Sequence, residues 1–315
     1  MIDRRQLGLA YLGLTLSALF WAGNAVLARA SVGLIAPFAL SFWRWVLALL
    51  ILLPFALPHL RREWRIALSH WQQLAALAAL SVGTYNTLLY LAAQSTTAVN
   101  ITLVSATMPV AIALMARLLL GQTLNGRQWL GIAIAVAGVA IIVGRSQPSA
   151  AAGINPGDLL MVIAVLVWGL YSVLLRRRPL QLHPLTVLLF LIAFGLPVIL
   201  PFYLWELRAG GGVTLSTATA AIFLFMAVFP SVLAYLFWNH GVAVAGPSQA
   251  GMFVYLIPLF TALLAGFFLG ERLQAHHALG AGLILAGLYL STRTRPASSA
   301  ALPARSPRQG RGAPS

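Results

Sequence analysis

The chain has 315 residues, of which 60% are hydrophobic and only 8% are charged. A soluble domain carries about 25% charged residues, so a water-soluble fold of this size is excluded. The apolar runs are long and unbroken, which favours membrane helices over a barrel, whose strands alternate polar and apolar residues. The composition therefore predicts an all-α integral membrane protein.

The formal charge of +15 does not indicate nucleic-acid binding. Every basic residue other than histidine is an arginine, and most of them lie at the ends of apolar runs, where they set orientation in the membrane. The absence of cysteine excludes disulfides and thiolate metal sites. The expected spans contain no histidine cluster, paired carboxylates or phosphate-binding loop, so we expect neither an enzyme nor a cofactor or metal.

Ten apolar segments are each long enough to cross a bilayer, which needs about 20 residues. Short connections rich in Gly, Pro, Ser and Asn separate them. The spans are expected near residues 7–28, 34–57, 72–93, 97–119, 127–144, 156–176, 184–205, 217–241, 247–269 and 275–292. Residues 293–315, rich in Pro, Ala, Ser and Arg, are expected to form a disordered cytoplasmic tail.

The arginines set the expected orientation. With the N-terminus in the cytoplasm, fifteen arginines lie in cytoplasmic segments and four, Arg29, Arg145, Arg208 and Arg272, lie on the opposite side. The positive-inside rule then places both termini in the cytoplasm. Residues 1–30 also resemble a signal peptide, but their apolar run exceeds the usual h-region, which favours a retained helix.

The two halves of the chain share a sequence pattern. Pro109 to Gly131, PVAIALMARLLLGQTLNGRQWLG, aligns without a gap with Pro258 to Gly280, PLFTALLAGFFLGERLQAHHALG. WAGNAVLAR at 21–29 likewise aligns with WGLYSVLLR at 168–176. Such an echo indicates a duplicated unit. Five helices per unit is an odd number, so the second unit enters the membrane from the opposite side, which predicts two inverted five-helix repeats.

GERL after the ninth span, GQTL after the fourth and the proline that precedes each resemble the EamA-type repeat of the drug/metabolite transporter superfamily. The resemblance covers residues 7–292. Within the superfamily, the chain resembles the bacterial exporters of aromatic and neutral amino acids. It implies ten helices around a central cavity. The repeats are expected at 1–145 and 154–292.

Polar and aromatic side chains inside the spans are candidates for lining this cavity, because polar groups turn away from lipid. The candidates are Trp21, Asn24, Arg44, Tyr85, Asn86, Tyr90, Asn100, Ser105, Trp168, Tyr171, Tyr235, Trp238, Asn239, His240 and Tyr255. Pro109 and Pro258 fall at matching places in the fourth and ninth spans and are candidate hinges, whereas Pro230 has no such pairing and is read as an ordinary membrane proline.

Arg44 is the one charge well inside a span, and two interpretations stay open for it. It binds backbone carbonyls and extends toward the interface, or it is the cavity cation for a substrate carboxylate. The five acidic residues, Asp3, Glu63, Asp158, Glu206 and Glu271, all lie near span ends. Glu271 is interpreted as a clamp between the ninth helix and its own loop.

The predicted function is export of neutral or aromatic amino acids, or similar small metabolites, across the bacterial plasma membrane. Membrane lipid and a small-molecule substrate are the expected partners. Because no acid lies at mid-membrane, uniport by alternating access is favoured. The alternative is a multidrug efflux transporter for lipophilic compounds, which could be proton-coupled.

Overall fold

The computed structural model describes residues 4–121, 124–144, 155–177, 180–245 and 253–292. Helices account for nearly all of them, and the described backbone adds one isolated antiparallel bridge between Ile35 and Val213. The expected tail at 293–315 and the start of the ninth span lie outside the described residues.

The helices follow the ten expected spans in order. The first repeat comprises α1 (Arg4–Ala30), α2 (Pro37–Ser69), α3 (Trp71–Ala78), η1 (Ala79–Tyr85), α4 (Asn86–Ala93), α5 (Ala98–Ser105), α6 (Met108–Leu120) and α7 (Gly126–Gly144). The second comprises α8 (Pro156–Arg177), α9 (Pro184–Arg208), α10 (Thr217–Met226), η2 (Ala227–Leu233), α11 (Ala234–Ala245), α13 (Leu256–Leu269) and α14 (Ala275–Thr292).

Consecutive segments join into membrane-spanning rods. The segments from α3 through η1 to α4 form one rod, and those from α10 through η2 to α11 form its counterpart. Among the described residues, seven of these rods are long and apolar enough to cross a membrane, and shorter apolar helices lie within α7 and at α13. The all-helical, ten-span architecture predicted from the sequence is confirmed.

The second helix, α2, is longer than expected. Its apolar run was predicted to end at residue 57, but the helix continues to Ser69 through Arg61 and Arg62. A fall in hydropathy marks where a helix leaves the membrane and does not require the backbone hydrogen bonds to end there. The extension is therefore a charged helical end beyond the apolar run.

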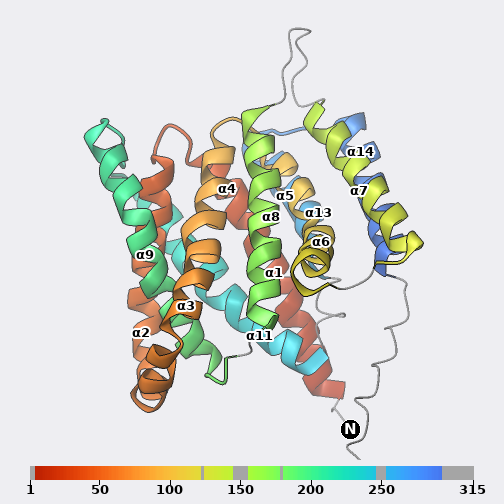
Figure 1. Cartoon of the computed structure of the whole chain (residues 1–315). Coiled ribbons are helices and arrows are strands. Elements are labelled where there is room, and N and C mark those ends of the chain that lie inside the picture. The colour runs from red at the N-terminus through yellow and green to blue at the C-terminus, as the bar shows by residue number, and fades with distance from the viewer. Residues whose placement is uncertain (1–3, 122–123, 145–154, 178–179, 246–252, 293–315) are drawn as a thin grey trace, which may run out of the picture.

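The repeats run in opposite directions, as five helices per repeat require. The Arg29 guanidinium, at the end of α1, donates to the Ala93 carbonyl (2.8 Å), and the Asn155 amide, just before α8, donates to the Ser95 carbonyl (2.8 Å). The α1 helix thus ends on the side of the bundle where α8 begins (Figure 1).

Helices α2 and α9, the second of each repeat, pack antiparallel at one edge of the bundle (Figure 1). The Glu206 carboxylate, near the end of α9, accepts from the backbone N–H of Phe38 (3.1 Å) and Ala39 (2.7 Å) at the start of α2. Glu63, near the end of α2, accepts from the N–H of His183 (2.9 Å) before α9. Each helix therefore carries the carboxylate that caps the other.

Helices α7 and α14, the fifth of each repeat, pack at the opposite edge (Figure 1). A Cβ at Gly138 would lie 2.7 Å from the Gly280 carbonyl oxygen, and one at Gly287 would lie 2.4 Å from the Gly131 carbonyl oxygen. Gly131 aligns with Gly280 and Gly138 with Gly287 in the repeat, so the contact is self-complementary, as two-fold symmetry demands. Backbones this close require glycine.

The fourth and ninth spans are interrupted at corresponding places. The α5 helix ends at Ser105 and α6 begins at Met108, while α13 begins at Leu256. Pro109 and Pro258 therefore lie in the first turn of a new helical segment, where the missing N–H leaves no backbone hydrogen bond unmade. Neither proline lies in the middle of an uninterrupted helix, where a kink would be expected. Their hinge role stays a prediction.

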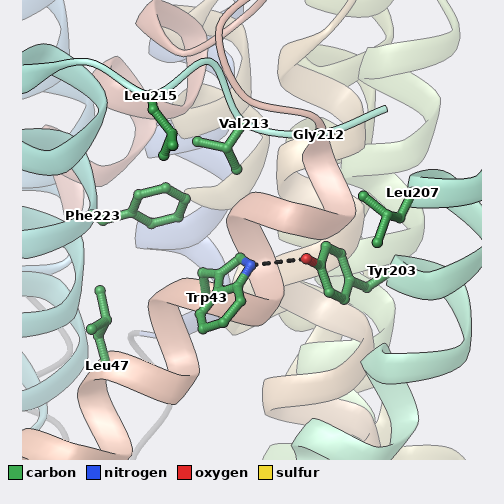
Figure 2. A pocket seen from close by; sticks show the side chains of 8 residues that line it. All are labelled: Trp43, Leu47, Tyr203, Leu207, Gly212, Val213, Leu215 and Phe223. Carbon is green, nitrogen blue, oxygen red and sulfur yellow. Dashed lines mark hydrogen bonds between the residues drawn. The ribbon is translucent and has the colours of Figure 1, made fainter. Parts of the chain in front are cut away.

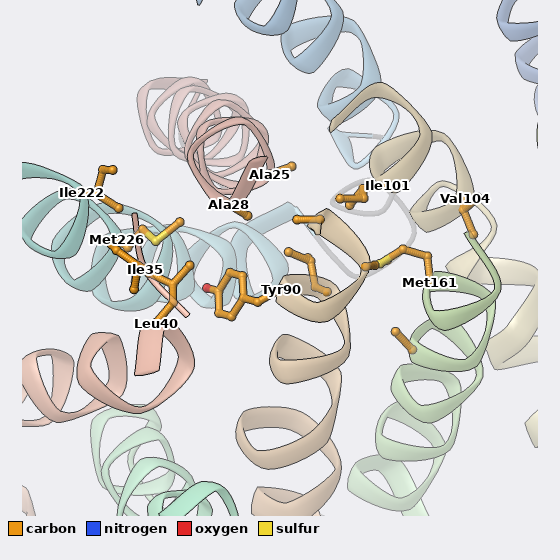
Figure 3. Close-up of a cluster of buried hydrophobic side chains, with 14 of the residues drawn as sticks. Ala25, Ala28, Ile35, Leu40, Tyr90, Ile101, Val104, Met161, Ile222 and Met226 are labelled. Carbon is orange, nitrogen blue, oxygen red and sulfur yellow. The ribbon is translucent and has the colours of Figure 1, made fainter. Parts of the chain in front are cut away.

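The core between the repeats is built largely from alanine and medium-sized apolar side chains. One cluster joins Ala25 and Ala28 of α1 with Leu40, Met161 and Met226. Figure 3 shows Tyr90 projecting from α4 toward this cluster. Small residues let α1 approach its neighbours, and this close packing is how helices associate in lipid.

We predict that Gly287→Ala separates α7 from α14, because the new Cβ would overlap the Gly131 carbonyl oxygen and the Ala135 backbone nitrogen. The overpacking should lower the free energy of unfolding by about 1–3 kcal/mol, measured as a lower thermal midpoint in detergent. Gly282→Ala, on the same helix but with nothing within 4 Å of its Cβ, is the control. Equal midpoints for the two variants would refute this account of the interface.

Candidate functional site

A buried arginine occupies the centre of the polar residues that the spans bring together. Arg44 lies seven residues into α2, and its side chain is 2% exposed. Removing a guanidinium from water costs several kcal/mol unless polar groups replace its hydration. The residues around Arg44 must therefore supply those groups.

The partners of Arg44 are all neutral. Its Nε donates to Ser231 Oγ (2.7 Å), and its Nη1 donates to Asn86 Oδ1 (3.0 Å) and to the Tyr90 hydroxyl. The Tyr90 hydroxyl in turn donates to Asn24 Oδ1 (3.1 Å), which extends the hydrogen-bond network to α1. Four helices, α1, α2, α4 and η2, thus converge on one cation, so the dipoles of these groups and not a counter-ion stabilise it.

Two π-helical segments position these partners. Asn86 directly follows η1 and donates to the Ser81 carbonyl (3.2 Å), while Ser231 lies in η2 and donates to the Met226 carbonyl (2.6 Å). Both bonds span five residues, the spacing of a π-helix. The segments occupy equivalent places in the two repeats, and π-turns of this kind are frequent at functional sites.

Pro230 explains the irregularity in η2 and is not the ordinary membrane proline that the sequence suggested. Proline has no N–H to offer the carbonyl four residues earlier, which belongs to Met226. The Ser231 hydroxyl takes that carbonyl instead. The Pro230 carbonyl accepts from Trp21 Nε1 (3.3 Å), so this proline helps to hold two candidate residues in place.

Aromatic rings surround the polar centre. Trp21 packs against Tyr235 (ring centroids 6.3 Å apart) and Trp238 (5.3 Å), and Trp168 packs against Tyr85 (4.8 Å) and Tyr171 (5.0 Å). These rings come from both repeats. The ring faces are apolar, and hydroxyl and indole N–H groups lie at the ring edges. The shell therefore suits a ligand that has an aromatic or aliphatic side chain and a small polar group.

Two hydrogen-bond donors at the centre lack partners in the part of the chain that the structure describes. Arg44 Nη2 donates to none of the described residues. Trp45, whose ring lies 4.5 Å below the Arg44 guanidinium carbon, is fully buried and its Nε1–H is unpaired. We call Asn24, Arg44, Trp45, Asn86, Tyr90 and Ser231 the Arg44 site. A ligand that accepts hydrogen bonds would satisfy these donors.

Trp45 and Ser231 are site residues that sequence reasoning missed. Trp45 follows Arg44 in the chain, and Ser231 follows Pro230. The available signals were a second aromatic next to a buried charge and a small polar residue next to a mid-span proline. Neither signal shows which helix a side chain will meet, because that depends on packing between the repeats.

The described carboxylates hold helix ends and lie away from the Arg44 site. Glu63 and Glu206 cap α9 and α2, and Asp158, fully buried near the start of α8, accepts from the Asn100 amide (3.2 Å). Glu271 accepts from the N–H groups of Ala98 (3.0 Å) and Val99 (3.3 Å). The prediction that Glu271 clamps its own loop is wrong, because its carboxylate caps α5 of the other repeat.

Several predicted cavity residues lie elsewhere. Asn100 belongs to the Asp158 network, and Tyr255 packs against the apolar cluster around α5 and α13. Ser105 lies beside the Tyr85 hydroxyl, at the edge of the aromatic shell. His240 is exposed near the end of α11, and the side chain of Asn239 is outside the described structure. The candidate residues that remain near Arg44 lie on α1, α2, α4, α8 and the rod formed by η2 and α11.

A separate apolar pocket of about 330 Å³ opens between α2, α9 and α10. Figure 2 shows Phe223 and Leu47 on one side of Trp43 and Tyr203 and Leu207 on the other. Trp43 Nε1 donates to the Tyr203 hydroxyl (3.1 Å). None of the Arg44 site residues lines this pocket, and its half-exposed Trp43 lies on a face of α2 other than the one that carries Arg44. We therefore take the Arg44 site, and not this pocket, as the candidate substrate site.

Comparison with known proteins matches this architecture. Residues 8–144 and 155–293 each match the EamA-like transporter family. An "uncharacterized transporter" of Archaeoglobus fulgidus is 31% identical over 288 residues, which cover 90% of this chain and 96% of the relative. A "probable terminal-alkyne amino-acid exporter" of Streptantibioticus cattleyicolor is 25% identical over 223 residues, covering 70% of this chain and 72% of the relative.

A solved crystal structure shares the fold. It aligns with a TM-score of 0.60 at 21% identity and covers 90% of this chain and 96% of the other. At this identity the likeness concerns the arrangement of the helices and not the ligand.

We predict that Ser231→Ala destabilises the protein by leaving Arg44 Nε buried without an acceptor. The loss should be about 1–3 kcal/mol in the free energy of unfolding, seen as a lower thermal midpoint. Ser172→Ala is the matched control, because the Ser172 hydroxyl donates only to the Trp168 carbonyl of its own helix (2.8 Å). If Ser172→Ala costs as much, Ser231 has no special role in solvating the charge.

Proposed function

Because the chain belongs to the EamA-like transporter family, we propose that it exports neutral or aromatic amino acids, or similar small metabolites, by uniport through alternating access. A small-molecule transporter is what the family implies. The amino-acid class, the direction and the uniport mechanism are the parts that we propose.

The observation that carries the proposal is the buried Arg44 with only neutral partners, inside an aromatic shell. A guanidinium pairs with a carboxylate through parallel hydrogen bonds, and its free Nη2 offers one of them. The rings of Trp21, Trp168 and Tyr235 offer apolar faces to a side chain. The amino-acid exporter of Streptantibioticus cattleyicolor, similar over 70% of this chain, is consistent with such a substrate.

Alternating access is supported by the inverted repeats. The contacts of α2 with α9 and of α7 with α14 each join equivalent helices, so either repeat can adopt the conformation that the other leaves. The Arg44 site lies between the repeats, with Arg44 and Asn86 from the first and Ser231 from the second. A substrate held there would face each side of the membrane in turn.

Uniport follows from how the acids are used. Glu63, Asp158, Glu206 and Glu271 each accept hydrogen bonds at a helix end, where their role is structural. A carboxylate at the substrate site is a common carrier of a coupled proton, and the described acids lie away from the Arg44 site. We therefore propose transport down the substrate gradient in the bacterial plasma membrane, with both termini in the cytoplasm as the arginine distribution favours.

The direct test is uptake of radiolabelled amino acids by proteoliposomes that contain only this protein. We predict saturable flux of phenylalanine, tryptophan and leucine and exclusion of glutamate and arginine. Arg44→Gln should reduce phenylalanine flux about 10–100-fold, because it removes a charged hydrogen bond worth about 1.5–3 kcal/mol. Arg208→Gln, an exposed arginine at the end of α9, should leave flux unchanged. Flux that is insensitive to Arg44→Gln would refute the assignment of the site.

Uniport predicts that an imposed pH gradient leaves the initial rate of phenylalanine flux unchanged. The check is to compare liposomes with equal and unequal internal and external pH, at the same substrate gradient. Accumulation of phenylalanine against its own gradient, driven by protons, would contradict the proposal and restore the proton-coupled alternative.

A further inference from the structure

We propose that the Arg44 site is selective for monocarboxylates with an apolar or aromatic body and no ammonium group, such as 2-oxo acids, 2-hydroxy acids and aryl alkanoates. They should bind at least as tightly as the corresponding amino acids. The inference rests on the proposed function in placing the substrate at Arg44, and it identifies the chemical group that the site recognises.

The first argument is charge balance. Within the described structure Arg44 brings one positive charge into the bundle, and the side chains that bond to it are neutral. A monoanion makes the occupied site neutral. A zwitterionic amino acid neutralises the guanidinium but adds an ammonium, so the occupied site keeps an uncompensated positive charge in a low-dielectric environment, which is costly.

The second argument is the supply of hydrogen bonds. Among the six residues of the Arg44 site, the polar atoms without a partner in the described structure are donors, among them Arg44 Nη2 and Trp45 Nε1. Both can point to a carboxylate oxygen, and neither can receive an ammonium proton. The site is therefore prepared for an acceptor.

The acceptors at the centre are already engaged. Asn86 Oδ1 accepts from Arg44, Asn24 Oδ1 accepts from Tyr90, and the Pro230 carbonyl accepts from Trp21. Each of these oxygens keeps a second lone pair, but an ammonium bound to Asn86 Oδ1 would lie beside the guanidinium that the same oxygen solvates. A carboxylate adds to the network without displacing a donor.

The third argument is the use of the ring faces. An ammonium without a carboxylate partner can still bind over an aromatic face. The faces nearest the centre, those of Trp45 and Tyr90, lie 4.5 Å and 5.6 Å from the Arg44 guanidinium carbon. A second cation at these rings would lie next to the first and be repelled by it.

The test uses the purified full-length protein and three isosteric probes. L-Phenylalanine carries both charges, 3-phenylpropionate lacks the ammonium, and L-phenylalaninamide lacks the carboxylate. Dissociation constants are measured by ligand-induced thermal stabilisation and by tryptophan fluorescence. We expect 3-phenylpropionate to bind about 3–10-fold more tightly than phenylalanine, a difference within about 1.4 kcal/mol. Phenylalaninamide should not bind at hundredfold higher concentration.

The variants assign the effect to Arg44. Arg44→Gln should abolish tight binding of 3-phenylpropionate, Arg44→Lys should restore part of it because the charge is kept, and Arg208→Gln should change nothing. Stronger binding of phenylalanine than of 3-phenylpropionate would overturn the inference. So would binding of phenylalaninamide at similar concentrations, or binding of 3-phenylpropionate that survives Arg44→Gln.

The flux experiment separates this inference from the proposed function. If phenylalanine crosses the liposome membrane but outcompetes 3-phenylpropionate, the proposed function stands and the inference fails. If 3-phenylpropionate binds through Arg44 and crosses the membrane while phenylalanine does neither, the inference stands and the amino-acid assignment fails. Folding of Arg44→Gln is checked by its thermal midpoint without ligand before either result is interpreted.

Discussion

The burial of one guanidinium governs the arrangement of the helices around it. A charge 2% exposed inside a membrane span has to be solvated by protein, and Arg44 is solvated by Asn86 and Tyr90 of α4 and by Ser231 of η2. Two of these groups come from α4 of the first repeat and one from η2 of the second. The cation therefore requires the two repeats to meet, and it ties the conformation of the site to their relative position.

The scaffold is symmetric but the charge is not. Each repeat has a π-helical segment at the same place in its third helix, and each places its second helix against that of the other repeat. Where α2 has Arg44, seven residues after Pro37, the equivalent position of α9, seven residues after Pro184, is Leu191, buried in an apolar cluster. Under the alternating access that we propose, duplication gives one chain two equivalent gates, while the single arginine makes the centre between them asymmetric.

The sequence predicted the ten spans, the duplicated unit and most of the aromatic residues around Arg44. Hydropathy and the repeated pattern can both be read directly from the order of the residues. It did not predict the π-helical segments, which depend on which carbonyl Ser231 or Asn86 can reach after packing. It also misassigned Glu271, whose partner N–H groups lie more than 170 positions earlier in the chain. Contacts between repeats depend on three-dimensional proximity, and one sequence carries no direct record of it.

For the alternating access that we propose, the remaining carboxylates bear on where the repeats could part. The carboxylates of Glu63, Glu206 and Glu271 each cap a helix of the opposite repeat, and all three lie at helix ends. Water can replace a cap there as the repeats part, so breaking these contacts costs little. At the centre water is excluded, and separating Arg44 from Ser231 would leave a bare cation unless another acceptor takes its place. The substrate carboxylate that we propose is such an acceptor, and with it bound we expect the conformational change to cost less than in the empty protein.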